Sequence, residues 1–257
     1  MKTQMLQPGP ALLPYVSSIV VLESEAGETA ADLPFYADGC PGLMFAQSRE
    51  GVVLHPQNQV LDEFILYGQT VHPISLHIKG DYRLLVFTLY PYVTKPFFDV
   101  NPEDITDSCL DLSLKWGEVL AMLKNAKTAA GQVNILGAFL QALSGANGGS
   151  INAAVRKAIH TIIDSNGNSS MKQIRDAVHM TERTFERQFF STIGISPKLF
   201  AQIVKFQSSL HQLTNEDRQQ LSDIVYKNGF ADQSHFIRTF KKFAGKTPGD
   251  FRRQAAR

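Results

Sequence analysis

The chain has 257 residues, 44% of them hydrophobic and 19% charged, which is ordinary for a soluble globular protein with a buried core. Its length predicts two domains, because single domains cluster near about 100–150 residues. No apolar stretch approaches the roughly 18 residues of a membrane span, and the N-terminal segment lacks the apolar core of a signal peptide. Cys40 and Cys109 are too few and too far apart for a disulfide scaffold. We therefore expect a cytoplasmic protein without a membrane partner.

The net charge of +1 hides a difference between the two parts of the chain. Residues 1–150 contain 8 Lys and Arg against 15 Asp and Glu, whereas residues 151–257 contain 17 against 9. Their formal charges are therefore −7 and +8. A compact basic part is typical of proteins that bind a polyanion, although basic solvated faces are also common.

Residues 15–100 are rich in short runs of β-type residues that are separated by turn signals such as Asp38-Gly39. One run alternates apolar and polar residues, as a half-buried strand does. The runs lie at 15–22, 42–46, 64–67, 74–78 and 84–90. We predict a cupin-like β-barrel or sandwich in an N-terminal sensor or dimerisation domain at 1–145.

Residues 112–143 change to helical periodicity and predict a pair of helices, one with an apolar face around Trp116 and Leu123. Two interpretations stay open for this pair. The helices either pack on the β-rich domain or form the seam of a homodimer through that domain. The charge balance changes sign in the Gly- and Asn-rich segment that follows, where we expect a linker at 146–150.

Residues 151–257 predict an all-α domain, and its main feature is an internal repeat with a period of 51 residues. Seven positions agree in type between the two copies. They pair as Phe185–Phe236, Arg187–Arg238, Phe189–Phe240, Gly194–Gly245, Ser196–Thr247, Pro197–Pro248 and Phe200–Phe251. A chance helical pattern would match only in its apolar stripe, so the repeat indicates a duplicated structural unit.

Each copy carries the start and stop signals of two short helices joined by a turn. In the first copy, Ser170 begins a capping box, Thr181 is an N-cap for the second helix, and Gly194 ends that helix. In the second copy, Asp232 caps the corresponding helix. Two such helices form a helix-turn-helix, and the predicted tandem units lie at about 170–194 and about 220–244.

The second helix of each unit has an apolar side for packing and a polar side that faces solvent. Residues four apart share a face, so Arg183 and Arg187 project together, as do Ser234 and Arg238. Arg binds guanine bidentately, Gln binds adenine, Glu accepts from cytosine, and flanking cations contact phosphates. We predict double-stranded DNA as the partner. The candidate DNA-binding residues are Thr181, Glu182, Arg183, Glu186, Arg187, Gln233, Ser234, His235, Arg238, Lys241 and Lys242.

The stretches Met171–Phe200 and Ile224–Arg252 closely resemble the signature of the AraC/XylS family of transcription regulators. The matching motifs are Gly229-Phe230, Ser234-His235-Phe236, Arg238 and Gly245-x-Thr247-Pro248. The resemblance implies a seven-helix DNA-binding domain at 151–257 with two major-groove helices, each of which reads part of one asymmetric site. Carried over by position, the base-facing residues are Arg183, Glu186, Arg187, Gln233, Ser234 and Arg238.

The first part of the chain is more loosely similar to the β-rich sensor region of some family members. The resemblance therefore implies a regulator that responds to a small-molecule effector. RNA polymerase is a further partner if the regulator is an activator. A front domain that only assembles oligomers, without a ligand, stays open as an alternative.

A different function class would need reactive or metal-binding groups. His55, His72 and His77 lie in the β-rich region, but they lack the paired His with a following Glu of a cupin metal site, so we predict neither a metal nor a cofactor. The competing function is a DNA-bound enzyme, such as a cysteine alkyl acceptor fused to the same DNA-binding domain. Cys40 and Cys109 lack a Pro-Cys-His neighbourhood or partner cysteines, so we predict that the chain is not an enzyme.

Overall fold

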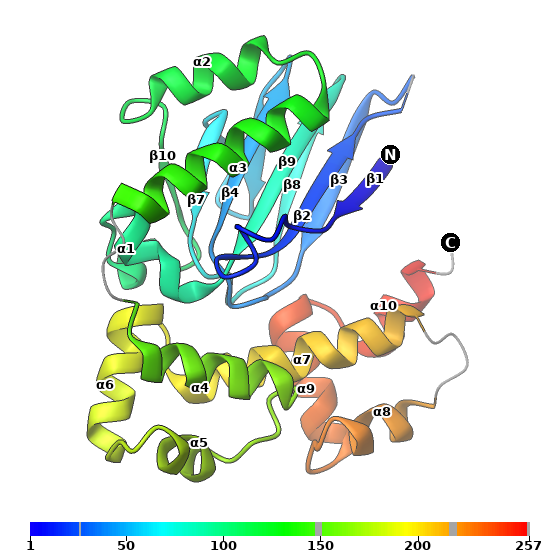
Figure 1. The fold of residues 1–257 in the computed structure, drawn as a ribbon. Helices are drawn as coiled ribbons and strands as arrows, with labels where there is room; N and C mark the ends of the chain where they lie inside the picture. Colours follow the sequence, from blue (N-terminus) through cyan, green and yellow to red (C-terminus); the bar gives the residue numbers. More distant parts are fainter. Residues whose placement is uncertain (26, 147–150, 216–219, 256–257) are drawn as a thin grey trace. The chain divides into compact units, whose positions relative to one another are not determined.

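The computed structural model describes residues 1–25, 27–146, 151–215 and 220–255. The chain divides into two compact units (Figure 1). The first comprises Met1–Phe35, Cys40–Gln69 and Ile74–Ile151, and the second comprises Tyr36–Gly39, Thr70–Pro73 and Asn152–Arg257. No helix among the described residues is long and apolar enough to cross a membrane.

The first unit is built on two β-sheets. The six-stranded sheet has the order β1 (Lys2–Leu6), β2 (Val16–Glu23), β9 (Tyr82–Leu89), β4 (Gly42–Ser48), β7 (Phe64–Tyr67) and β10 (Cys109–Asp111). The four-stranded sheet has the order β3 (Ala30–Phe35), β8 (Ile74–Lys79), β5 (Val52–His55) and β6 (Gln59–Leu61). The sandwich alternative is therefore correct and the closed barrel is wrong, because the two sheets remain separate.

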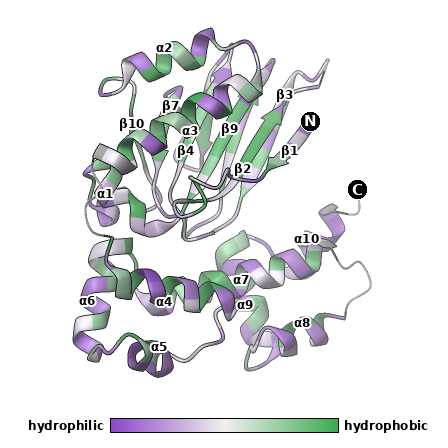
Figure 2. Ribbon diagram, in the orientation of Figure 1, coloured by the Kyte–Doolittle hydropathy of each residue, from purple (hydrophilic) through white to green (hydrophobic). Residues whose placement is uncertain are grey.

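Alternating side chains of the strands explain why this unit has two apolar layers. One layer lies between the sheets and includes Leu84 and Val86 of β9 with Leu76 and Ile78 of β8. The intervening residues of the six-stranded sheet face the other way and are equally buried, as Leu85 is. Figure 2 shows the resulting hydrophobic strands at the centre of the unit.

All five predicted runs are strands, but the sequence did not predict β1, β3, β5, β6 or β10. Strand β1 is an edge strand whose first four residues are exposed, so it lacks an apolar period. Strand β3 contains Pro34, which a central strand would not tolerate; it pairs only with β8, at the edge of its sheet.

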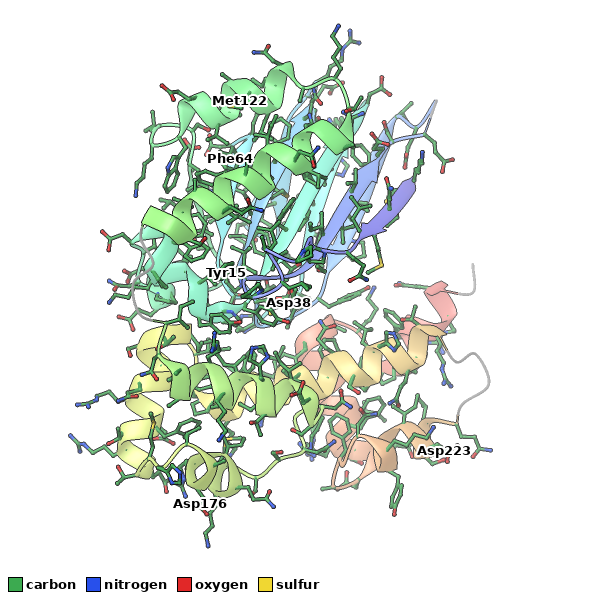
Figure 3. The ribbon with its side chains drawn as sticks, in the orientation of Figure 1. Tyr15, Asp38, Phe64, Met122, Asp176 and Asp223 are labelled. Atoms are coloured by element: carbon green, nitrogen blue, oxygen red, sulfur yellow. The ribbon has the colours of Figure 1, made fainter. Side chains whose placement is uncertain are left out.

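The helices of the first unit are short except for α3 (Ala129–Ala146). The remaining ones are η1 (Pro91–Val93), α1 (Thr94–Phe98), η2 (Pro102–Ile105) and α2 (Gly117–Asn125). Helix α3 runs across the six-stranded sheet (Figure 1), and Phe139 packs against Phe64 with ring centroids 5.9 Å apart. Figure 3 labels Phe64 at this position.

The predicted helical pair at 112–143 is present, and it packs on its own sheet. The prediction placed its start too early, because residues 112–116 precede α2 and the Leu112 amide donates to the Phe64 carbonyl as an extension of the sheet. The homodimer seam stays a prediction. Of the expected linker at 146–150, Ala146 ends α3, and residues 147–150 lie outside the described residues.

The helices of the second unit follow the predicted starts and stops. They are α4 (Ala153–Asp164), α5 (Met171–Ala177), α6 (Glu182–Ile193), α7 (Pro197–Asn215), α8 (Leu221–Lys227), α9 (Gln233–Ala244) and α10 (Pro248–Ala255). Helix α7 contacts both α6 and α9. It is the amphipathic connector between the two copies of the repeat.

Aromatic rings fill the core of the second unit. Phe185, Phe189, Phe236 and Phe240 are at most 1% exposed, as their helical spacing predicts. Phe206 of α7 packs on the Phe240 ring with centroids 5.2 Å apart and is itself fully buried. Interiors are close-packed, so each ring fixes the position of its neighbours.

The short segment Tyr36–Gly39 belongs to this same unit. The Ala37 amide donates to the Phe243 carbonyl at 3.2 Å, near the end of α9, and the Gln207 side-chain amide of α7 donates to the Ala37 carbonyl at 2.6 Å. Both backbone groups of a fully buried residue are thereby satisfied. Gly39 has a positive φ of 68°, and a Cβ atom there would lie 3.1 Å from the Phe200 ring.

We expect Phe206→Ala to lower the free energy of unfolding of the second unit by about 3–5 kcal/mol, because it opens a cavity between α7 and α9. Phe190→Ala is the matched control, since Phe190 is 45% exposed on α6 and should change stability by no more than about 0.5 kcal/mol. Thermal unfolding followed by circular dichroism measures both. Equal effects of the two changes would contradict this account of the core.

Candidate nucleic-acid interface

The first helix-turn-helix consists of α5, a turn and α6, and local hydrogen bonds fix its ends. Ser170 and Gln173 form a capping box at the start of α5. The turn places His179 at a positive φ of 54°. The Thr181 hydroxyl accepts from the Thr184 amide at 3.4 Å to cap α6, and Gly194 ends α6 in the left-handed region.

The second helix-turn-helix, α8 to α9, repeats this construction with different residues. Gly229 takes a positive φ of 63° in the turn, and a Cβ atom there would meet the Asn168 side chain at 2.5 Å. The Asp232 carboxylate accepts from the His235 amide at 2.7 Å to cap α9. Gly245 ends α9 with a φ of 72°. In Figure 3, Asp176 and Asp223 mark α5 and α8, the first helices of the two units.

We call α6 and α9 the recognition helices, because each presents a polar ridge opposite its buried phenylalanines. On α6, Arg183, Glu186 and Arg187 are exposed, whereas Phe185 and Phe189 of the same helix are buried. Residues at positions i and i+4 share a face, so the two arginines extend from the same side of α6. The structure brings these three predicted residues together on one helix face.

Two other predicted residues of the first helix-turn-helix have structural partners. Thr181 is the N-cap of α6, and its hydroxyl also contacts the Thr184 hydroxyl at 3.0 Å. Glu182 forms an ion pair with Arg175 of α5, which ties the two helices of the unit together. Arg175 was not predicted from the sequence; its signal is the seven-residue spacing to Glu182, an acid on the other side of the turn.

On α9, Gln233, Ser234 and Arg238 are exposed in the first two turns, and Lys241 and Lys242 are exposed in the last turn. This ridge contains no acidic side chain from Gln233 to Ala244. By contrast, α6 carries Glu182 and Glu186 beside its two arginines. The ridge of α9 is therefore the more strongly cationic of the two.

His235 differs from the other predicted residues of α9. It is half-buried, and its ring packs edge-on against Phe230 with centroids 5.7 Å apart. Its buried Nδ1 atom has no hydrogen-bond partner among the described residues. This position favours a packing role at the turn.

Lys205 of α7 was not predicted, and it supports the second turn. Its Nζ atom donates to the Gly229 carbonyl at 3.1 Å and lies 5.7 Å from the centroid of the Phe230 ring. Burial lowers the pKa of Lys205. The buried Asn228 side chain donates to Gln212 of the same connector and to the Ile224 carbonyl, each at 2.9 Å. The connector α7 thus holds the turn of the second helix-turn-helix through polar as well as aromatic contacts.

The residues weighed for other chemistries are spread over the chain. His77 contacts the Asp32 carboxylate at 2.8 Å, and its ring lies 6.2 Å from that of His55. Across the part of the chain that the structure describes, no three His, Cys, Asp or Glu side chains gather as metal ligands would. Cys40 and Cys109 form no disulfide within the described residues.

Two family matches cover most of the chain in turn. Residues 174–254 match a family described as "Helix-turn-helix domain", and residues 4–111 match one described as "Domain of unknown function (DUF6597)". Over 82 residues the chain is 30% identical to the HTH-type transcriptional activator RhaS of Yersinia pestis (strain Pestoides F) and of Yersinia pseudotuberculosis serotype O:1b (strain IP 31758). This match covers 32% of the chain and 30% of each relative, so the chain spans under a third of the length of these curated relatives.

Solved structures of ToxT from Vibrio cholerae have the same fold. One, from V. cholerae O395, has a TM-score of 0.50 at 10% identity and covers 91% of this chain and 98% of that chain. Another, in the P21 crystal form, has a TM-score of 0.50 at 11% identity and covers 98% of both chains. Both the β-rich unit and the helical unit therefore occur together in a known two-domain fold.

We expect Asp232→Ala to raise the hydrogen-exchange rate of the backbone amides in the first turn of α9 about fivefold, because an N-cap contributes about 1 kcal/mol. Asp232→Asn should leave these rates near those of the unchanged protein, since Asn also caps helices well. Hydrogen exchange followed by mass spectrometry measures the local effect. Equally fast exchange in both variants would contradict a capping role for this side chain.

Proposed function

We propose that the chain is a sequence-specific DNA-binding transcription regulator of the AraC type, a proposal that the helix-turn-helix family match over residues 174–254 supports. The observation that carries the proposal is the repeated ridge: α6 and α9 each turn exposed arginines outward from a helix whose opposite side is locked by buried phenylalanines. Each ridge then reads one segment of the major groove.

Base edges are read by the side chains near the start of each recognition helix. Arg183 and Arg187 of α6 and Arg238 of α9 each suit guanine, to which the guanidinium fork donates two parallel hydrogen bonds. Gln233 suits adenine in the same geometry. Glu186 accepts from the amino group of cytosine, and its charge excludes it from close approach to a phosphate.

Phosphate contacts come from the exposed cations at the end of α9. Lys241 and Lys242 are compact charges without a fixed fork, so they fit phosphate oxygens better than base edges. They also lie on the more cationic of the two ridges. The second helix-turn-helix therefore supplies more of the salt-dependent affinity, and α6 of the first contributes relatively more to base discrimination.

The cysteine alkyl acceptor has less support. An acceptor cysteine reacts as a thiolate, which needs a pKa below the ordinary value. Burial, and then the nearby carboxylate of Asp62, raises the pKa of the Cys109 thiol instead. Cys40 belongs to no cluster of the kind that a zinc ion would need among the described residues.

The β-rich first unit acts as the regulatory part, either by binding a small-molecule effector or by assembling two copies of the chain. An effector changes transcription only if it binds the DNA-competent and DNA-incompetent states with different affinity. An activator additionally requires a contact with RNA polymerase. The mapping of bound sites across a genome would identify the regulated genes.

We expect Arg238→Ala to weaken binding to the preferred site by about 1–3 kcal/mol and to relax base preference at one position. The measurement is enrichment of double-stranded sequences from a random pool by the full chain, followed by affinity measurement on the winning sequence. Arg156→Ala, an exposed change on α4, is the control and should keep the winning sequence. If the unchanged protein enriched no sequence at moderate salt, the proposed function would be wrong.

We expect the double change Lys241→Gln and Lys242→Gln to reduce affinity equally for all sequences. Each lost phosphate contact should lower the slope of log affinity against log salt by about 0.9. Arg156→Gln with Lys198→Gln removes the same charge from exposed positions on α4 and α7 and should leave the slope near its original value. A loss confined to one base position would instead make these lysines base readers.

A further inference from the structure

A row of polar side chains crosses four strands at one end of the six-stranded sheet. Lys2 lies opposite Glu23, Glu23 opposite Arg83, and Arg83 opposite Gln47 in the strand register. Directly opposed residues share a face of a sheet. The Arg83 guanidinium donates to the Glu23 carboxylate at 2.5 Å, which holds the centre of the row in place.

This row lies on the face that α3 covers. Phe45 is opposite Phe64, whose ring packs on α3, and Gln47 is two residues further along the same strand. Phe45 and Leu85 are fully buried under the helix, so the apolar layer ends where the polar row begins. The row is the floor of an open cleft of about 910 Å³ beside the turn between α2 and α3.

Gln132 of α3 joins this floor to the cleft wall. It is fully buried, and its side-chain nitrogen donates to Gln47 Oε1 at 3.3 Å and to the carbonyls of Leu123 and Ala126 at 3.2 and 3.4 Å. Its Oε1 atom is buried without a hydrogen-bond partner in the described part of the chain. The Gln47 side chain of the floor is thereby tied to the turn between α2 and α3.

Most of the Lys and Arg side chains of residues 1–150 line this cleft, although that part of the chain has few of them. Residues 1–150 contain eight Lys and Arg, and five of them line the cleft: Lys2, Arg49, Arg83, Lys124 and Lys127. Only three of the fifteen Asp and Glu do so, and one of these, Glu23, is already paired with Arg83. The lining is formally +2 within a region of −7.

Three of these cations are available to a ligand. Lys2, Arg49 and Lys127 are exposed, and none of the three side chains has an ion pair or hydrogen bond among the described residues. Like charges in one cleft repel each other, and an anion with several oxygen atoms relieves this repulsion while it accepts from the Arg49 fork. Because the amide of Gln47 is fixed through its oxygen, its nitrogen is left to donate to the same ligand.

We propose that this cleft binds a small polyanion, of the class of tricarboxylates and sugar phosphates. The carboxylate or phosphate groups occupy the cation-lined floor, where Arg49, Lys127 and the side-chain nitrogen of Gln47 donate to their oxygen atoms. That this ligand is the effector of the regulator rests on the proposed function, whereas its binding does not.

The test is isothermal titration calorimetry of the full chain with citrate, glucose 6-phosphate and glucose. We expect citrate or glucose 6-phosphate to bind with one site per chain, and the comparison of the two assigns the preferred anionic group. Glucose has the hydroxyl groups without the charge and should not bind. Failure of both anions at millimolar concentration, or equal binding of glucose, would overturn the proposal.

The residues are tested by the double change Arg49→Gln and Lys127→Gln, which we expect to weaken anion binding at least tenfold. The chain offers a matched control in two of its three remaining cations before residue 150: Lys79→Gln with Lys95→Gln removes the same charge outside the cleft and should stay within twofold. Unchanged affinity of the first variant would overturn the assignment of the site. Weaker DNA binding by that variant without ligand would assign these cations to DNA phosphates and overturn it equally.

DNA affinity measured with and without the bound anion separates the two proposals. A change in DNA affinity that is lost in the cleft variant makes the ligand an effector. Sequence enrichment that fails while citrate or glucose 6-phosphate still binds would remove the regulator and keep the ligand site. The reverse result would remove the ligand site and keep the regulator.

Discussion

Phenylalanine packing on one connecting helix determines which side of each recognition helix faces solvent. Phe200 of α7 packs against Phe189 of α6 at 5.8 Å, and Phe206 of the same helix packs against Phe240 of α9 at 5.2 Å. Rotation of either recognition helix would pull a ring out of a close-packed core and leave a cavity. The exposed arginines therefore owe their placement to residues that contact no solvent.

The sequence predicts this part well because its signals are local. N-caps at Thr181 and Asp232 and helix ends at Gly194 and Gly245 all lie within a few residues of the elements they define. Because the same cap and end signals recur 51 residues later, each copy supports the prediction made from the other. What the sequence could not show is the support from Lys205, because its hydrogen bond to Gly229 joins residues 24 positions apart.

The β-rich unit was predicted less completely for the same physical reason. Central strands such as β9 are continuous apolar runs and can be predicted from the sequence. The edge strands β1 and β3 are recognisable only from the strands they pair with. The polar row of the cleft is less local still, since Lys2 and Arg83 are about eighty residues apart in the sequence and lie on either side of Glu23 only because β1 and β9 both pair with β2. The count of charged residues showed that this part of the chain is acidic. It did not show that the strand pairings bring most of its cations to one cleft.

The separation of charge also constrains how a bound anion could influence DNA. The first part of the chain carries −7 and the second +8, so phosphates of DNA are attracted to the helical unit while the first unit repels them outside its cleft. Charges in water are screened beyond about 8 Å at physiological salt, so the ligand's own charge does not act over longer distances. Coupling then has to pass through packing. Gln47 is placed for it, because its side chain lines the cleft and accepts from Gln132, which also donates to the Ala126 carbonyl between α2 and α3. A ligand that binds Gln47 in only one arrangement of this turn stabilises that arrangement over others.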